Sequence, residues 1–261
     1  MKTQVICFAN NKGGSGKSTT CANVGYGLTQ LGKKVLLIDG DMQLNLSLSF
    51  FTEDQVLEFA QGDKNLYYAV KNQKDLKNYI VHTPYENLDM IPSSTLMSSI
   101  EYELFTKWQR EFILKKCLKS IMDSEEYDYI LIDCPPSLGI LTVNGLAAAD
   151  SVLVPMQCEY FALEGITLLL QTVQKVQKEI NPSLTIGGIF FTMYDARTRL
   201  AQDVVLQVKS YFKEVVFNTI IPRNVRLSEA PSHGLPICKY DANCQGAKSY
   251  ENLAKEVIER G

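Results

Sequence analysis

The chain has 261 residues and a mass of 29.3 kDa, which is enough for one large hydrophobic core and short for two. Its formal net charge is −3, so the surface as a whole does not attract nucleic acid, and DNA binding would need a local basic patch or an assembled state. No apolar run approaches the roughly 20 residues of a membrane-spanning helix, and seven cysteines without a CxxC pair indicate reduced, mostly buried thiols in a cytosolic protein.

Short apolar runs rich in β-branched residues alternate along the chain with stretches of helical periodicity. We expect strands at residues 5–9, 35–39, 88–91, 129–133, 151–155, 185–191 and 215–220. We expect helices at 19–31, 94–122 and 163–180, with Trp108 in the core, and short helices and loops over 52–87. Continuous apolar strands separated by helices predict an α/β fold, in which a doubly wound, mostly parallel sheet carries helices on both faces.

The first predicted strand runs into the sequence NNKGGSGKSTT, residues 10–20, and then into the first predicted helix. A strand, a glycine-rich loop and a helix form the arrangement that cradles phosphate, because backbone N–H groups and the positive end of the helix face the anion. Lys17 is expected to reach the β- and γ-phosphates of a nucleotide, and the Ser18 hydroxyl to ligate Mg²⁺. The nucleotide-binding residues predicted here are Lys12, Gly13, Gly14, Ser15, Gly16, Lys17, Ser18 and Thr19.

This loop departs from the usual pattern G-x-x-x-x-G-K-[ST], because Asn11 stands where the first glycine belongs. The segment from Lys12 to Ser18 reads K-G-G-x-G-K-S and resembles the deviant Walker A ATPases of the MinD/ParA superfamily, which are P-loop NTPases that use ATP and Mg²⁺. The resemblance implies that Lys12 and Lys17 both belong to the catalytic set, and that Lys12 contacts the nucleotide bound by the partner subunit of an ATP-bound homodimer. Two triphosphates buried face to face need such cations to offset their charge.

Two predicted strands end in carboxylates at the edge where the phosphate loop is expected. The sequence VLLIDGDMQLN, residues 35–45, resembles the family's DxDPQGN, with Met42 in place of proline and Leu44 in place of glycine. Asp41 matches the catalytic position that orients the attacking water, and Asp39 is expected to support the loop or the metal shell. Asp133 ends the next such strand, where a carboxylate can hold Mg²⁺, usually through water.

Longer segments at 140–165, 192–199 and 220–233 resemble ParA/Soj-type chromosome and plasmid partition ATPases. The resemblance implies that Pro222, Arg223 and Asn224 surround the adenine base and that Glu159 contacts the nucleotide from the facing subunit. It also implies a single ATPase domain over 1–261, of the short kind without an N-terminal helix-turn-helix domain. The expected activity is hydrolysis of ATP to ADP and phosphate, slow in isolation and stimulated by a ParB-type centromere-binding protein.

The resemblance further implies that the ATP-bound dimer binds double-stranded DNA without sequence preference, in the cytoplasm and on the nucleoid. The DNA contacts that we expect are Arg197, Arg199, Arg223 and Arg226. Residues 195–229 hold six Lys/Arg against four Asp/Glu, a local charge of +2 in an acidic chain. Phosphate contacts of this kind would make the affinity fall steeply with salt and would carry no base specificity.

Three alternative functions use the same residues. A membrane-cycling, MinD-like ATPase would carry a basic amphipathic C-terminal helix, whereas the end SYENLAKEVIERG keeps Glu251, Glu256 and Glu259, so no membrane partner is expected. A ParA-like ATPase that positions a different cargo cannot be distinguished here, because the adaptor differs and the ATPase does not. A non-enzymatic, nucleotide-locked scaffold would require a broken catalytic set, and Lys12, Lys17, Asp41 and Asp133 are all present.

Overall fold

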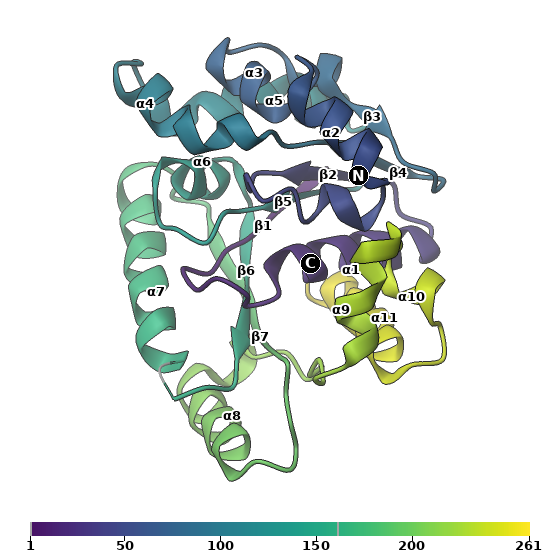
Figure 1. The fold of residues 1–261 in the computed structure, drawn as a ribbon. Coiled ribbons are helices and arrows are strands. Elements are labelled where there is room, and N and C mark those ends of the chain that lie inside the picture. The colour runs from purple at the N-terminus through teal and green to yellow at the C-terminus, as the bar shows by residue number, and fades with distance from the viewer. Residues whose placement is uncertain (1, 161) are drawn as a thin grey trace.

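The computed structural model describes residues 2–160 and 162–261; Met1 and Phe161, the latter within the segment 140–165, lie outside the description. In the described part, seven strands form one sheet in the order β3-β4-β2-β5-β1-β6-β7 (Figure 1). The strands are β1 Gln4–Phe8, β2 Val35–Asp39, β3 Val81–His82, β4 Leu88–Ile91, β5 Tyr129–Asp133, β6 Ser151–Gln157 and β7 Thr185–Thr192. Of the strands described, only the short β3 pairs antiparallel, with β4, so the predicted doubly wound, mostly parallel sheet is confirmed.

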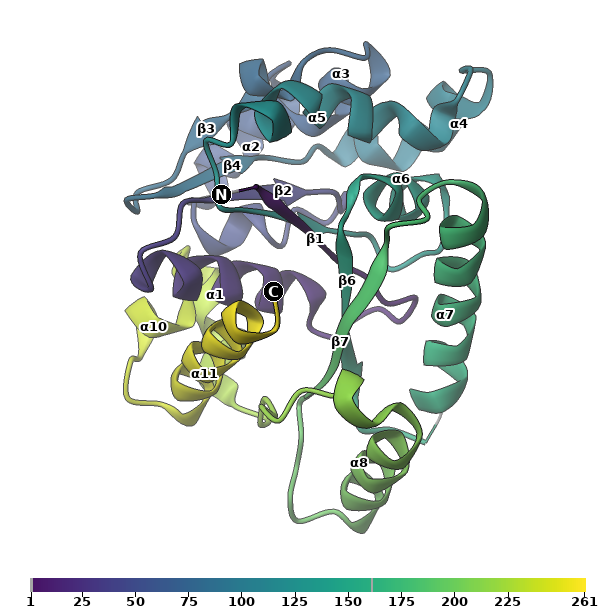
Figure 2. The same ribbon diagram turned by 180° about the vertical axis from the view of Figure 1, so that it is seen from behind.

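Helices cover both faces of the sheet, because successive strand side chains point to opposite sides. Val5 and Cys7 of β1 belong to one buried cluster, and Ile6 and Phe8 belong to the other. The helices α5 Ile113–Ser124, α6 Ile140–Ala148 and α7 Ala162–Glu179 lie on the first face, and α1 Lys17–Gln30 and α11 Gln245–Arg260 on the second (Figures 1 and 2). The remaining helices are α2 Glu53–Gln61, α3 Leu66–Lys71, α4 Ile100–Phe105, α8 Arg199–Phe212, α9 Val225–Glu229 and α10 Ile237–Tyr240.

The prediction of one long helix over 94–122 is wrong. The segment folds as a 3₁₀ turn at Thr95–Ser99, helix α4, a second 3₁₀ turn at Arg110–Phe112, and helix α5. The break is stabilised by Asn144 of α6, whose amide donates to the Arg110 carbonyl at 2.9 Å and whose side-chain oxygen accepts from the Leu114 N–H at 3.0 Å. Because the chain turns outward here, Trp108 is 85% exposed rather than part of the core.

The predicted strand at 215–220 is also absent from the described structure, which has a 3₁₀ turn at Lys213–Val215 and a single bridge from Val216 to Ile189. The backbone N–H groups of Asn218 and Thr219 donate to the Glu256 carboxylate of α11, at 2.8 and 3.0 Å, instead of joining the sheet. Glu256 is therefore buried and occupied within the fold, and is not one of the solvent-facing acids of the last helix.

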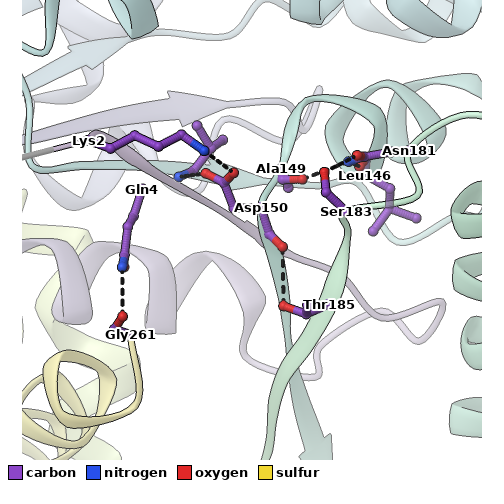
Figure 3. A network of polar contacts seen from close by, with 10 residues as sticks. Lys2, Gln4, Leu146, Ala149, Asp150, Asn181, Ser183, Thr185 and Gly261 are labelled. Atoms are coloured by element: carbon purple, nitrogen blue, oxygen red, sulfur yellow. Dashed lines mark hydrogen bonds and ion pairs between the residues drawn. The ribbon is translucent and has the colours of Figure 1, made fainter.

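Polar contacts tie the amino ends of the strands together, at the edge of the sheet away from the phosphate loop (Figure 3). Asp150, just before β6, accepts from the Val5 N–H at 2.9 Å and from the Lys2 ammonium at 3.2 Å. Gln4 donates to the carbonyl of Gly261 at 3.1 Å, which joins the first strand to the chain end. No helix among the described residues combines the length and the apolar character needed to cross a bilayer.

Candidate functional site

The carboxyl ends of the parallel strands open onto a large cleft of about 1210 Å³, the place where sheets of this kind bind ligands. The cleft collects most of the predicted site residues from four separate segments of the chain. They are Gly13, Gly14, Ser15, Gly16, Lys17, Ser18, Thr19, Asp41, Glu159, Pro222, Arg223 and Asn224. Lys12, Asp39 and Asp133 lie beside this lining rather than in it.

The loop between β1 and α1 has the backbone that a phosphate cradle needs. Gly14 and Gly16 have φ angles of +71° and +87°, a left-handed conformation that side chains other than glycine rarely adopt. Gly16 is the N-cap of α1, and no side chain of the described residues caps this helix, so the N–H groups of its first turn are available to an anion.

Two residues that were not predicted from the sequence brace this loop from neighbouring strands. Gln157, at the end of β6, donates to the Gly14 carbonyl at 2.6 Å. Thr192, at the end of β7, donates to the Ser15 carbonyl at 2.8 Å. Their position as polar residues at the carboxyl ends of two predicted strands is the signal that would have identified them.

Lys17 is a buried cation, and no carboxylate of the described residues forms an ion pair with it. Its side chain is almost wholly buried, and the ammonium donates to the Lys12 carbonyl at 3.2 Å. Burial lowers the pKa of Lys17, and the nearby Asp133 and Asp41 carboxylates oppose that shift. An ammonium held in this way beside an uncapped helix start is suited to a phosphate group, which would supply the missing negative charge.

Asp133 is a fully buried carboxylate, and neither of its oxygens has a hydrogen-bond partner in the part of the chain that the structure describes. Burial raises its pKa well above the usual value, and the negative charge of Asp39 adds to the shift. The Ser18 hydroxyl lies near enough to Asp133 to offset part of this rise in pKa. Its position does not have the geometry of a hydrogen bond to the carboxylate. A buried, unpartnered carboxylate beside a serine hydroxyl is an oxygen donor set that fits Mg²⁺.

Asp39 is also fully buried, but its oxygens are already occupied. It accepts from the Asp41 N–H at 3.2 Å, from the Ser47 N–H at 2.9 Å and from the Ser47 hydroxyl at 2.6 Å. Burial raises the pKa of Asp39 to about 6, against the lowering effect of the Ser47 hydrogen bonds. Of its two predicted roles, this geometry supports the loop role, and we assign no metal contact to Asp39.

The loop that carries Asp41 turns through an unusual residue. The Asp41 carboxylate accepts from the Gln43 N–H at 3.1 Å, and the Asp41 carbonyl accepts from the Leu44 N–H at 3.1 Å. Leu44 has a φ of +60° and is only 8% exposed. The left-handed conformation costs a leucine roughly 1–2 kcal/mol, and burial of its side chain contributes roughly 1.5–3 kcal/mol in the opposite direction. Met42, the other departure from the family pattern, lies exposed.

Lys12 turns toward its own chain, where its ammonium forms an ion pair with Glu159. The two side chains are 46% and 55% exposed, and exposed pairs of this kind are worth only about 0–1 kcal/mol. The contact joins the phosphate loop to the segment after β6. Both residues were predicted from the sequence to lie near nucleotide, but their pairing with each other was not.

The four predicted DNA contacts lie in two segments: Arg197 just before α8 and Arg199 at its start, and Arg223 and Arg226 just before and within α9. An isolated bridge between Tyr194 and Pro222, and a hydrogen bond of 2.9 Å from the Arg223 N–H to the Tyr194 carbonyl, bring the two segments side by side. Within them, Arg197 binds the Asp195 carboxylate through two nitrogens at 2.7 and 2.9 Å.

The other arginines differ in how strongly acids of the same chain hold them. Arg226 contacts Glu229 at 2.9 Å, whereas Arg199 is 93% exposed and comes only within 3.9 Å of Asp203. Arg223 lines the cleft and is exposed. Arg199 and Arg223 are thus more available to an outside anion than Arg197 and Arg226.

Comparisons with known proteins agree with this geometry. The sequence profile of a family described as "AAA domain" matches residues 3–186. The chain is similar to the "Chromosome-partitioning ATPase Soj" of Treponema pallidum (strain Nichols), with 54% identity over 257 residues and 98% of each chain covered. It is similar to the "Sporulation initiation inhibitor protein Soj" of Bacillus subtilis (strain 168), with 48% identity and 99% of each chain covered. The fold is similar to that of cobyrinic acid a,c-diamide synthase from Mycobacterium smegmatis, a structure solved with a bound ATP analog and magnesium. The TM-score is 0.82 and the identity 32%, and the match covers 98% of this chain and 95% of that chain.

Proposed function

This chain belongs to the ParA/Soj-type partition ATPases, and from that premise we propose that it alternates between a monomer and an ATP-bound homodimer that binds DNA without sequence preference. Residues 1–261 would act as one ATPase domain. For the function we rely on the two Soj relatives, which are 54% and 48% identical over nearly the whole chain, rather than on the synthase structure, which is 32% identical. The cargo that we propose is a chromosome or plasmid.

The observation that carries the ATPase activity is the buried ammonium of Lys17, at the uncapped start of α1 and near the buried Asp133 carboxylate. In this arrangement Lys17 and the backbone of the glycine loop would bind the phosphates of ATP, and Ser18 and Asp133 would hold Mg²⁺. The metal would supply positive charge that offsets the charge of the phosphates. Pro222 and Asn224, which also line the cleft, would enclose the base.

Hydrolysis then depends on two further side chains. Asp41, almost wholly buried at the edge of the cleft, orients the attacking water. Lys12 reaches the nucleotide of the facing subunit, which requires it to leave Glu159. Phosphoryl transfer relies on positioning and on neutralised charge more than on covalent chemistry, so an isolated chain whose Lys12 is held by Glu159 should hydrolyse ATP slowly.

The finer parts of the proposal concern partners. A ParB-type adaptor would stimulate hydrolysis and so release the dimer from DNA. The dimer would bind DNA phosphates through Arg199 and Arg223, with Arg197 and Arg226 contributing after they leave their acidic neighbours. Doubling this patch in a dimer multiplies the phosphate contacts, and the protein would accordingly lie on the nucleoid in the cytoplasm.

A membrane-cycling function has less support. The apolar residues Leu253 and Val257 of α11 are buried against the rest of the fold, so this helix offers no free apolar face to a lipid surface. A different cargo on the same DNA-bound dimer stays open as the second candidate, since it would use the same ATPase site.

Co-sedimentation with double-stranded DNA tests the proposal. The protein should pellet with DNA in ATP and Mg²⁺ but not in ADP or without nucleotide, and raising the salt concentration should abolish pelleting. Pelleting that is indifferent to nucleotide would count against the ATP-dependent dimer and favour ordinary electrostatic binding.

A further inference from the structure

We propose that Leu44 is a positioning residue for ATP hydrolysis, which holds the loop carrying Asp41 by filling an apolar space beneath it. This inference rests on the proposed ATPase function. It concerns the position at which the chain departs most from the resembling motif, since Leu44 stands where DxDPQGN has glycine.

The backbone of this loop follows the path of a glycine although the residue is a leucine. Leu44 has a φ of +60°, a conformation that bulky residues adopt only when their surroundings compensate for the strain. The turn is closed on both sides, because the Leu44 N–H donates to the Asp41 carbonyl at 3.1 Å and the Leu44 carbonyl accepts from the Leu48 N–H at 2.9 Å. Leu44, with its left-handed backbone, therefore lies in the middle of a hydrogen-bonded segment that runs from Asp41 to the next helical turn.

The side chain of Leu44 is the apolar anchor nearest to Asp41 in that segment, and Leu46 follows it into the same buried cluster. Met42, Gln43 and Asn45 around it are exposed, whereas Leu44 is buried in the cluster formed on the α1 and α11 face of the sheet. A side chain buried in this way converts a strained turn into a single fixed conformation, whereas a glycine would leave the turn free to sample others.

A polar contact set holds the two ends of the same loop. Asp39 binds the Asp41 N–H at one end and the N–H and hydroxyl of Ser47 at the other. Among the described residues, the polar contacts of the middle of the loop, residues 42–45, stay within the loop and the turn after it: the Gln43 N–H donates to the Asp41 carboxylate, and the Asn45 carbonyl accepts from the Ser49 hydroxyl. Leu44 supplies the anchor there, so Asp41 is held in place before any nucleotide is bound.

The experiment compares the full-length variants Leu44→Gly, Leu44→Ala and Leu44→Met with the wild type. The first two should lower kcat for ATP hydrolysis by roughly 10- to 100-fold, the range expected for small misplacements of a reacting group, with KM within about twofold. Leu44→Met, which keeps an apolar side chain of similar volume, should keep kcat near the wild-type value. Leu118→Ala serves as the control, because it removes a buried leucine on the opposite face and should lower thermal stability without changing kcat.

A second readout does not depend on activity. Amide hydrogen exchange over residues 40–48, measured without nucleotide, should become faster in Leu44→Gly than in the wild type and stay unchanged in Leu118→Ala. A kcat within twofold of wild type for Leu44→Gly, together with unchanged exchange in this loop, would overturn the inference. A wild-type protein that hydrolyses no ATP would instead overturn the proposed function and the positioning role with it, while the exchange measurement would still decide whether Leu44 anchors the loop.

Discussion

Replacing Glu159 with glutamine should strengthen the ATP-dependent dimer. The change removes the carboxylate that holds Lys12 on its own chain while preserving the size of the side chain. Both side chains are about half exposed, so each pair contributes roughly 0.2–1 kcal/mol. Two pairs open when a dimer closes, which amounts to roughly 0.4–2 kcal/mol, or a two- to 30-fold lower dimer dissociation constant.

Sedimentation velocity over a range of protein concentrations, with a non-hydrolysable ATP analogue and Mg²⁺, measures this constant. The gain should shrink at high salt, because salt screens the exposed pair that the mutation removes. Lys12→Gln should abolish dimerisation, and the double variant should behave like Lys12→Gln. A weaker dimer for Glu159→Gln would refute the reasoning and would favour the alternative expectation, in which Glu159 contacts the nucleotide of the facing subunit.

Three further outcomes follow from the site. Asp41→Ala should reduce ATP hydrolysis, measured by phosphate release, by roughly 100-fold. The variant should also stay bound to DNA in the presence of ATP, measured by DNA retention. Unchanged hydrolysis would show that Asp41 is not a catalytic residue. Arg199→Ala should make the slope of log affinity for DNA against log salt shallower by about one for each phosphate that this arginine neutralises, and an unchanged slope would exclude this arginine from the DNA surface. Burial raises the pKa of Asp39 to about 6, above the roughly 3.9 of an aspartate in an unfolded chain. Between about pH 4 and pH 6 the folded state therefore binds more protons than the unfolded state. The free energy of unfolding that this carboxyl contributes falls as pH rises through that window. The urea midpoint of the wild type minus that of Asp39→Asn should therefore decrease from pH 4 to pH 7, and an increase would contradict the pKa.

The parts of the fold that the sequence predicted are those specified by local pattern. Buried parallel strands are apolar along their whole length, so β1, β2, β4, β5, β6 and β7 could be located from composition alone. The phosphate loop could also be predicted, because its backbone has positive φ angles that require glycine, as at Gly14 and Gly16, and because a helical pattern follows it.

The parts that it did not predict depend on contacts between distant segments. The break before α5 is stabilised by Asn144, thirty residues further along the chain. The segment 215–220 keeps one bridge to β7 but forms no strand, because Glu256 binds the N–H groups of Asn218 and Thr219. Neither partner is visible in the local periodicity, which is equally compatible with a long helix and a further strand.

The candidate site was also predicted only in part. The types and spacing of Lys17, Ser18, Asp41 and Asp133 indicated their chemistry, and most of this set meets at one cleft. The pairing of Lys12 with Glu159 and the bracing of the loop by Gln157 and Thr192 arise from the order of strands in the sheet, which composition does not specify.

The central claim is that ATP joins two copies of the chain and that Lys12 is needed for that union. The molar mass in solution, measured by light scattering on a size-exclusion column with a saturating non-hydrolysable ATP analogue and Mg²⁺, tests it most directly. The wild type should change from 29.3 kDa to twice that mass, and Lys12→Gln should stay at the mass of one chain while still binding the analogue. A wild type that remains a single chain at saturation, or a Lys12→Gln variant that dimerises as well as the wild type, would contradict the account.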